Sequence, residues 1–189
     1  MRSVFQWSLK SRTLELGKHT LIMGVINVTP DSFSDGGLYA DFQQACGHAL
    51  QLLAEGADII DIGGESTRPG AAVVNASEPK AQGQESANSS RTPKVAVSAE
   101  DEMQRVLPVI TELKKLRPDA VISIDTYKAS VARAGVAAGA EIVNDVSALR
   151  WDREMAKTVA DLKCGVVLMH TRGRPEEWRT LPPPGDIVL

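Results

Sequence analysis

Apolar and polar positions alternate along the chain in two different rhythms, which predict strands and helices by turns. Short apolar runs fit buried strands, and between them apolar residues recur every three or four positions, as on one face of a helix. The runs predict strands at 21–26, 57–63, 120–125, 141–145 and 165–170, with helices at 40–55, 99–116, 128–138 and 152–163. Strict alternation at 4–9 and 12–16 predicts a small β-hairpin ahead of them.

The order of these elements predicts an α/β fold with a parallel sheet. Each strand is a continuous apolar run, as expected for strands buried on both faces. No G-x-G-x-x-G follows the first strand, and polar residues end every strand, which favours a barrel over a dinucleotide-binding sheet. The elements therefore predict an α/β barrel with about five β/α units and an N-terminal hairpin.

Two local features modify this picture. Pro108 falls inside the helix at 99–116 and predicts a kink or a split there, whereas Ser98 fits the N-cap of the same helix. The stretch 75–94 contains no Val, Ile, Leu, Met or aromatic residue. It therefore has little apolar surface to bury, and we interpret it as a flexible loop insertion within the domain.

Composition excludes some classes of function. A net charge of −3 and an aromatic content of 4% argue against a nucleic-acid partner and against a membrane surface. No segment approaches the apolar length of a membrane span, and the first residues lack the apolar run of a signal peptide. Cys46 and Cys164 fit buried, reduced thiols, so we expect a cytoplasmic protein.

A polar residue follows the end of each expected strand. These residues are Asn27, the run Glu65-Ser66-Thr67-Arg68, Asp125-Thr126, Asn144-Asp145 and His170. Consecutive parallel strands bring their carboxyl ends together, and in barrels that rim holds the active site. We therefore expect these side chains to converge at one rim.

Several of these residues also have ordinary structural explanations. Asp125 or Thr126 fits the N-cap of the next helix about as well, and His170 fits a neutral histidine bound to a loop carbonyl. Arg68 is harder to explain in that way, because two glycines precede it and Pro69-Gly70 follows. A guanidinium held beside glycine amides suits an anion such as phosphate. Glu65 is expected to pair with a basic group and hold this loop.

Two long motifs, NVTPDSFSDGG (27–37) and GGESTRPGA (63–71), resemble the signature loops of the dihydropteroate synthase family. SIDTYKA (123–129), IVNDVSA (142–148) and VVLMHTRG (166–173) also match its later strands, in order. The resemblance implies a pterin-binding (β/α)8 TIM barrel, and it makes this chain a partial (β/α)8 TIM barrel of about five β/α units with an N-terminal β-hairpin. It also implies condensation of 6-hydroxymethyl-7,8-dihydropterin pyrophosphate with 4-aminobenzoate, with Mg²⁺ assisting, in an enzyme that sulfonamides target and that forms a homodimer when complete.

The resemblance assigns roles to particular residues. Asn27 matches the Mg²⁺ ligand, and Thr67 and Arg68 match donors to the phosphates, which makes these three the expected catalytic residues. The expected substrate-binding residues are Asp125 and Asn144 on the pterin edge, Val146 and Met169 on its faces, and Phe33 and Pro69 over the aminobenzoate.

One departure from the family is large. Its members continue through further strands that carry an Asp-Pro-Gly, a Ser-Arg-Lys and an Arg-x-His, and none of these occurs here. We therefore interpret residues 1–189 as a pterin-binding barrel domain truncated at its C-terminus, not active alone. The alternatives are an inactive or binding-only fragment of that enzyme, and a pterin-dependent methyltransferase on the same barrel.

Overall fold

The computed structural model describes residues 3–29, 37–66 and 96–175, together with 177, 178, 180–182 and 185. The expected insertion at 75–94 lies outside the described residues. Its flexibility, and the extent of a single domain over 1–189, therefore stay predictions.

Every predicted strand and helix has a counterpart within a few residues of its expected bounds. The hairpin is β1 (Phe5–Ser8) and β2 (Thr13–Leu16). The alternating elements are β3 (Met23–Asn27), α1 (Gly37–Ala54), β4 (Ile59–Gly63), α2 (Ala99–Leu116), β5 (Val121–Asp125), α3 (Ala129–Ala138), β6 (Ile142–Asp145), α4 (Met155–Leu162) and β7 (Gly165–Leu168).

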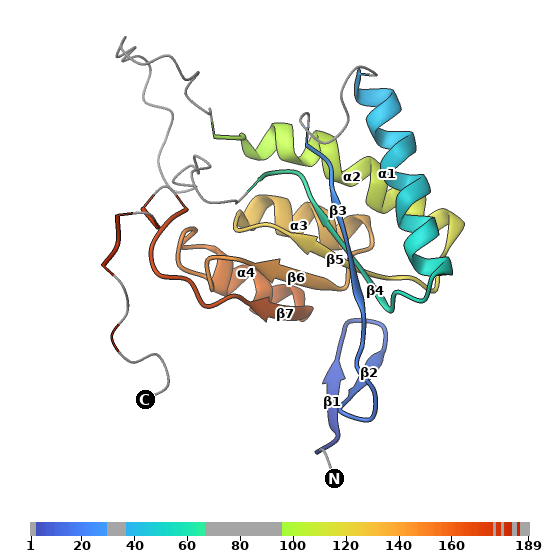
Figure 1. Cartoon of the computed structure of the whole chain (residues 1–189), viewed down its shortest axis with the longest axis horizontal. Helices are drawn as coiled ribbons and strands as arrows, with labels where there is room; N and C mark the ends of the chain where they lie inside the picture. The colour runs from blue at the N-terminus through green and yellow to red at the C-terminus, as the bar shows by residue number, and fades with distance from the viewer. Residues whose placement is uncertain are drawn as a thin grey trace.

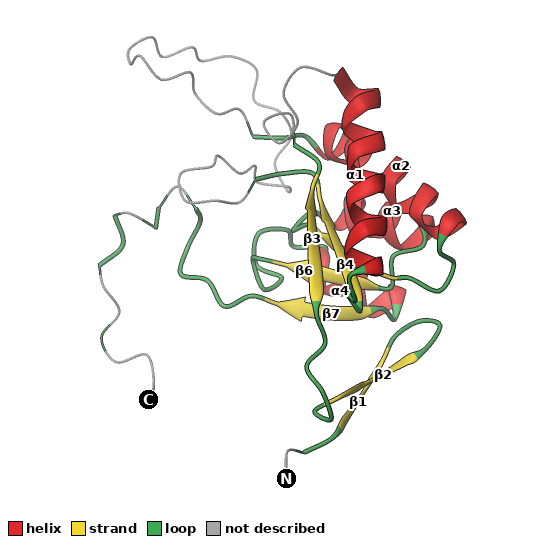
Figure 2. Cartoon of the chain, turned by 45° about the vertical axis from the view of Figure 1, so that its right-hand side comes forward, coloured by secondary structure: helices red, strands yellow, loops and turns green. Residues whose placement is uncertain are grey.

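The sheet confirms the predicted α/β architecture. Its five strands lie in the order β3-β4-β5-β6-β7, and each neighbouring pair is parallel. The helices cover one side of the sheet, and the hairpin lies beyond the N-terminal end of β3 (Figures 1 and 2). Sequential parallel strands with helical crossovers are the repeating unit of a β/α barrel, so the described chain forms part of one.

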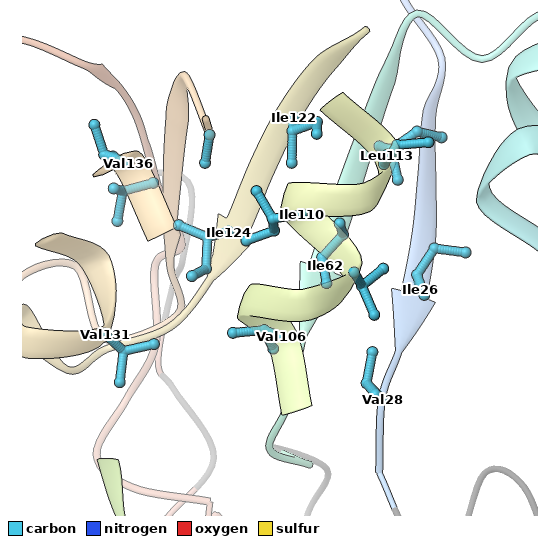
Figure 3. Packing of buried hydrophobic residues seen from close by; sticks show 14 of the residues in the cluster. Ile26, Val28, Ile62, Val106, Ile110, Leu113, Ile122, Ile124, Val131 and Val136 are labelled. Atoms are coloured by element: carbon cyan, nitrogen blue, oxygen red, sulfur yellow. The ribbon is translucent and has the colours of Figure 1, made fainter. Parts of the chain in front are cut away.

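The main core lies between the sheet and the helices. Ile62, Ile122 and Ile124 project from neighbouring strands against Val106 and Ile110 of α2 (Figure 3). All five side chains are fully buried. Each such Val or Ile contributes about 1.5–3 kcal/mol relative to an exposed position. The strands are continuous apolar runs because side chains on both faces of the sheet are packed, those on one face in this core and those on the other against the hairpin.

The opposite face of the sheet is closed at its N-terminal end by the hairpin. Trp7, Leu9 and Leu14 of the hairpin segment pack on Ile59, Val121 and Ile142 of the sheet. A polar contact fixes this position, because Glu141 accepts hydrogen bonds from Ser11 Oγ at 2.5 Å and pairs with Arg12 Nη2 at 3.0 Å. The hairpin thus covers one end of this face and leaves the carboxyl end for the candidate site.

Two local predictions need correction. Pro108 was expected to kink or split α2, and the split is wrong because this helix runs unbroken from Ala99 to Leu116. Pro108 lies on the exposed side of the helix, where water can satisfy the carbonyl that loses its partner, while the opposite side stays buried. Cys164 is only half-buried, whereas Cys46 is buried as expected, and both are free thiols.

Other local predictions hold. Ser98 is the N-cap of α2 and its hydroxyl accepts a hydrogen bond from Asp101 N at 3.0 Å. Within the described ranges, no helix has the length and apolar character needed to cross a membrane.

Candidate active site

Four residues at the carboxyl ends of adjacent strands form one row across the sheet. Asn27 pairs in register with Gly63, Gly63 with Asp125, and Asp125 with Asn144. Residues paired in a parallel sheet point to the same face, here the face away from the helices. With strands about 4.8 Å apart, the row spans about 14 Å. The structure thus brings together three of the predicted site residues, Asn27, Asp125 and Asn144.

Gly63 leaves space for the Asp125 side chain next to it in this row. A Cβ atom at this position would lie 3.2 Å from Asp125 Oδ2 and 3.3 Å from Asp125 Cβ. These distances are tighter than ordinary contacts, so a side chain at position 63 would displace the Asp125 carboxylate. The absence of a side chain leaves that carboxylate over the strand ends.

Asp125 has the electrostatics of a binding group and not of a helix cap. Burial raises the pKa of its carboxyl well above the ordinary value, and the nearby carboxylate of Asp61 adds to the shift. The N-cap alternative is wrong, because Asp152 Oδ2 caps α3 by accepting from Ala129 N at 2.8 Å. Thr126 Oγ1 instead accepts from Lys128 N at 3.1 Å. No described residue hydrogen-bonds the Asp125 carboxylate, which leaves it available to a ligand's N–H groups.

Asn144 is held from below by a residue that the sequence analysis missed. Its Nδ2 donates to Asp61 Oδ2 at 3.0 Å. Asp61 lies in the middle of β4 and is 3% exposed. The signal in the sequence was an acidic residue inside an otherwise apolar strand, because a carboxylate is rarely buried unless polar groups stabilise it.

An apolar surface adjoins the polar row. Val146, which is buried, and Met169 belong to one small cluster with Tyr127 and Trp151. The two aromatic rings meet edge to face with centroids 5.1 Å apart. The structure thus brings together Val146 and Met169, which were predicted to contact the faces of one flat ligand.

The loop after β6 that carries Val146 has an unusual backbone. Ala148 and Leu149 have φ angles of 51° and 65°, in the left-handed region that non-glycine residues avoid. Asp145 holds this conformation by accepting from Ser147 N at 2.7 Å and from Leu149 N at 2.9 Å. Asp145 is therefore used within its own loop, and Val146 is placed by a constrained turn.

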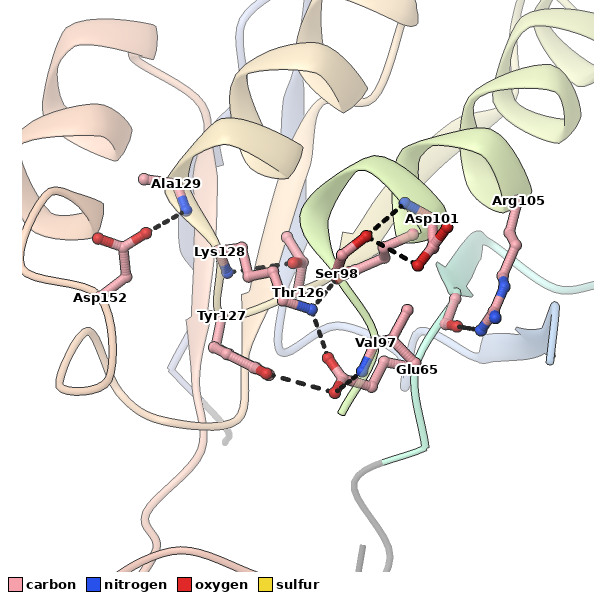
Figure 4. A network of polar contacts seen from close by, with 12 residues as sticks. Glu65, Val97, Ser98, Asp101, Arg105, Thr126, Tyr127, Lys128, Ala129 and Asp152 are labelled. Carbon is pink, nitrogen blue, oxygen red and sulfur yellow. Dashed lines mark hydrogen bonds and ion pairs between the residues drawn. The ribbon is translucent and has the colours of Figure 1, made fainter. Parts of the chain in front are cut away.

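A buried ion cluster lies at the start of the loop that follows β4 (Figure 4). Lys128 Nζ lies 2.5 Å from both Glu65 Oε2 and Glu102 Oε2, and all three side chains are almost fully buried. Tyr127 Oη donates to Glu65 Oε1 at 3.3 Å. Burial raises the pKa of Glu102, and the Lys128 charge offsets part of that effect.

The prediction that Glu65 pairs with a basic group is therefore confirmed. Lys128 and Glu102 were missed, because nothing local to either residue indicates a partner 26 or 63 positions away. The cluster ties the end of β4 to α2 and α3, so it anchors the first residues of the loop that carries Thr67 and Arg68.

Phe33, Thr67, Arg68 and Pro69 lie outside the described residues, so their roles stay predictions. His170 is exposed and bonds no loop carbonyl among the described residues, contrary to the expectation for it. The described part contains no group of three or more His, Cys, Asp or Glu residues able to hold a metal. The exposed Asn27 still suits Mg²⁺, which takes few protein oxygens when phosphate and water complete its shell.

Comparison with known proteins agrees with this geometry. The model of the pterin binding enzyme family matches residues 23–81 and 86–188, and the chain belongs to that family. Dihydropteroate synthase of Bacillus subtilis is 44% identical over 163 residues, which are 86% of this chain and 49% of that protein. The chain thus spans about half the length of the curated relatives it matches.

Solved structures show the same likeness. The Xanthomonas albilineans dihydropteroate synthase with 4-aminobenzoic acid is 42% identical with a TM-score of 0.72, over 90% of this chain and 53% of that one. The Yersinia pestis dihydropteroate synthase in a sulfonamide drug complex is 36% identical with a TM-score of 0.75, over 96% of this chain and 57% of that one. These matches confirm both the resemblance to dihydropteroate synthases and the predicted fold.

Proposed function

We propose that this chain is part of a dihydropteroate synthase of folate biosynthesis. The reaction joins 6-hydroxymethyl-7,8-dihydropterin pyrophosphate to 4-aminobenzoate and releases 7,8-dihydropteroate and pyrophosphate. The observation that carries the proposal is the row of Asn27, Gly63, Asp125 and Asn144 on one face of the sheet. Relatives named dihydropteroate synthase support it over the methyltransferase alternative.

The polar row suits the edge of a pterin. That edge carries ring N–H and amino groups, which need acceptors in fixed places. Asp125 supplies a carboxylate whose pKa is raised by burial, so N–H donors of a bound ring would favour its ionised form. Asn144 supplies an amide whose NH₂ group is already engaged by Asp61. Val146 and Met169 would pack on the faces of the ring, next to the buried rings of Tyr127 and Trp151.

The leaving pyrophosphate requires stabilisation of growing negative charge. In the proposed reaction the bond from the pterin methylene carbon to the pyrophosphate oxygen breaks, the amine nitrogen of 4-aminobenzoate bonds to that carbon, and the amine loses a proton. Thr67 and Arg68 would donate to the phosphate oxygens. Asn27 would hold Mg²⁺, which supplies positive charge for the departing phosphates. Phe33 and Pro69 would close over the aminobenzoate.

Activity is tested with purified protein, the pterin pyrophosphate, 4-aminobenzoate and Mg²⁺. Residues 1–189 are assayed alone and joined to the C-terminal half of the Xanthomonas albilineans enzyme, here termed the completed chain. We expect sulfonamide-sensitive product from the completed chain and none above background from residues 1–189, because catalytic groups act as a unit. A folded completed chain that binds both substrates and forms no dihydropteroate would contradict the proposal.

Arg68→Ala in the completed chain tests the anion site. Loss of one donor to developing charge should lower kcat by about 10²–10³-fold, while the free energy of unfolding changes by no more than about 0.5 kcal/mol. Arg133→Ala on the exposed side of α3 is the matched control. Equal turnover in the two variants would remove Arg68 from the anion site.

A cytoplasmic location and a homodimer of the complete protein also belong to this proposal. Two free thiols support the first. Sedimentation of the completed chain at several concentrations tests the second, and a monomer throughout would contradict it.

A further inference from the structure

Asp61 is a buried acidic residue on the same face of the sheet as the candidate site. It is 3% exposed and lies in register between Val25 of β3 and Ser123 of β5, one row below the strand ends. A carboxylate in such a place is costly unless polar groups surround it. Asn144 Nδ2 donates a hydrogen bond to Asp61 Oδ2 at 3.0 Å.

This contact determines which end of the Asn144 amide faces a ligand. The oxygen and nitrogen of an asparagine amide have almost the same shape, so an unrestrained side chain can present either. An ionised carboxylate only accepts hydrogen bonds, so Asp61 selects the NH₂ end. Burial raises the pKa of Asp61, and the neighbouring Ser123 and Asn144 side chains offset part of that rise and so favour the ionised form. Because Asp61 lies one row deeper than Asn144, the carbonyl Oδ1 of Asn144 turns toward the strand ends.

Asp125 lies next to Asn144 in register and presents a second acceptor. Two neighbouring acceptors, one a carboxylate and one an amide carbonyl, match a ligand edge that carries adjacent N–H donors. They disfavour an edge that carries a carbonyl in place of one donor, because two acceptors would then face each other.

A second polar side chain lies beside Asp61 on the same face of the sheet. Ser123 is fully buried, pairs in register with Asp61, and lowers the pKa of Asp61 as a hydrogen-bonding neighbour. Ser123 and Asn144 together therefore favour an ionised Asp61 carboxylate, which can only accept from the Asn144 amide.

We propose that Asp61 is a positioning residue that sets the donor–acceptor pattern of the site by orienting the Asn144 amide. The site thereby selects heterocycles with a 2-amino-4-oxo edge over 2,4-dioxo analogues. The choice of heterocycle rests on the proposed function, whereas the orientation of Asn144 rests on the hydrogen bond alone.

Binding of two pteridines to residues 1–189 tests the selection. Pterin carries an amino group where lumazine carries a carbonyl, and ligand fluorescence gives a Kd for each. The unchanged chain should bind pterin at least about tenfold more tightly, the ratio expected when one hydrogen bond is replaced by opposed acceptors. Asp61→Asn should reduce this ratio to about threefold or less, because an amide in place of the Asp61 carboxylate can also donate and lets the Asn144 amide turn over.

Asp58→Asn is the matched control, since Asp58 is exposed before the other end of β4 and accepts from Ile22 N at 2.8 Å. It should leave the ratio unchanged. An unchanged ratio in Asp61→Asn would overturn the inference while pterin binding and the proposed function stand.

Hydrogen exchange at the Asn144 side chain gives a second measurement that needs no ligand. Its NH₂ signal is identified by its loss in Asn144→Ala, and one of its hydrogens should be protected in the unchanged chain and unprotected in Asp61→Ala. If residues 1–189 bind neither pteridine, the exchange result decides the orientation and the same Kd ratio is measured in the completed chain, where binding of neither pteridine would contradict the proposed function. Rapid exchange of both hydrogens in the unchanged chain would overturn the inference.

Discussion

Lys128→Met should destabilise the protein strongly, because it removes a positive charge that lies between two buried carboxylates. Lys128 Nζ lies 2.5 Å from Glu65 and Glu102, whose side chains are 5% and 1% exposed. Removing one partner of a buried ion pair costs about 3–5 kcal/mol, since the remaining charges stay desolvated. A domain has about 5–15 kcal/mol in total, so the loss is a large fraction of the free energy of unfolding.

The free energy of unfolding lost in Lys128→Met should be larger at high pH than at low pH. Burial raises the pKa of Glu102, so Glu102 stays protonated in the folded state at pH values where it is ionised in the unfolded chain. Stability therefore falls as pH rises through the interval between those two pKa values. Without Lys128 the pKa of Glu102 rises further and the interval widens. The deficit of Lys128→Met should therefore be smaller at about pH 5 than at about pH 8.

Urea unfolding followed by circular dichroism measures both effects. Lys157→Met is the matched control, because Lys157 and Asp161 form an exposed pair with side chains 71% and 52% exposed. Such a pair contributes about 0.5 kcal/mol or less. Adding Glu102→Gln to Lys128→Met should recover part of the loss, since one buried charge is removed. A loss below about 1 kcal/mol at pH 8, or the same loss at both pH values, would refute the argument.

Three further outcomes can be checked on the same chain. Asp152→Ala should cost about 1–2 kcal/mol in urea unfolding, because Asp152 Oδ2 accepts from Ala129 N and Oδ1 accepts from Glu154 N, and Asp152→Asn, which keeps one of the two acceptor oxygens, should cost less; equal costs would contradict this. Gly135→Ala should cost about 1–3 kcal/mol, because its Cβ would lie 2.3 Å from Ile124 Cδ1, and Ile124→Val, which lacks that atom, should make the same change milder. Burial raises the pKa of the Cys46 and Cys164 thiols, so both should react with a thiol reagent far more slowly in the native than in the unfolded chain, and equal rates would be inconsistent with the structure.

Most of the fold could be predicted because it depends on local periodicity. A strand buried on both faces reads as a continuous apolar run, and a helix that covers it reads as an apolar stripe, whatever the rest of the chain does. Pro108 shows where local rules end. Its effect on α2 depends on which side of the helix it occupies, and the tertiary packing of Val106, Val109 and Ile110 decides that.

The candidate site was also predicted only in part. The chain order of strand ends was enough to predict that Asn27, Asp125 and Asn144 meet, because parallel strands place their carboxyl ends together. Asp61 was not predicted, because its contact with the site is a hydrogen bond to Asn144, which lies 83 positions away along the chain.

The sequence by itself determined the order of strands and helices, the family, and the residue types at the strand ends, since each is set by neighbours along the chain. Only the tertiary structure decided the partners of the buried charges. Glu65, Glu102 and Lys128 come from the ends of different elements and meet only after the sheet and helices have packed. Their pairing, and the orientation that Asp61 imposes on Asn144, depend on distances of a few ångströms across the fold, which no local pattern of residues encodes.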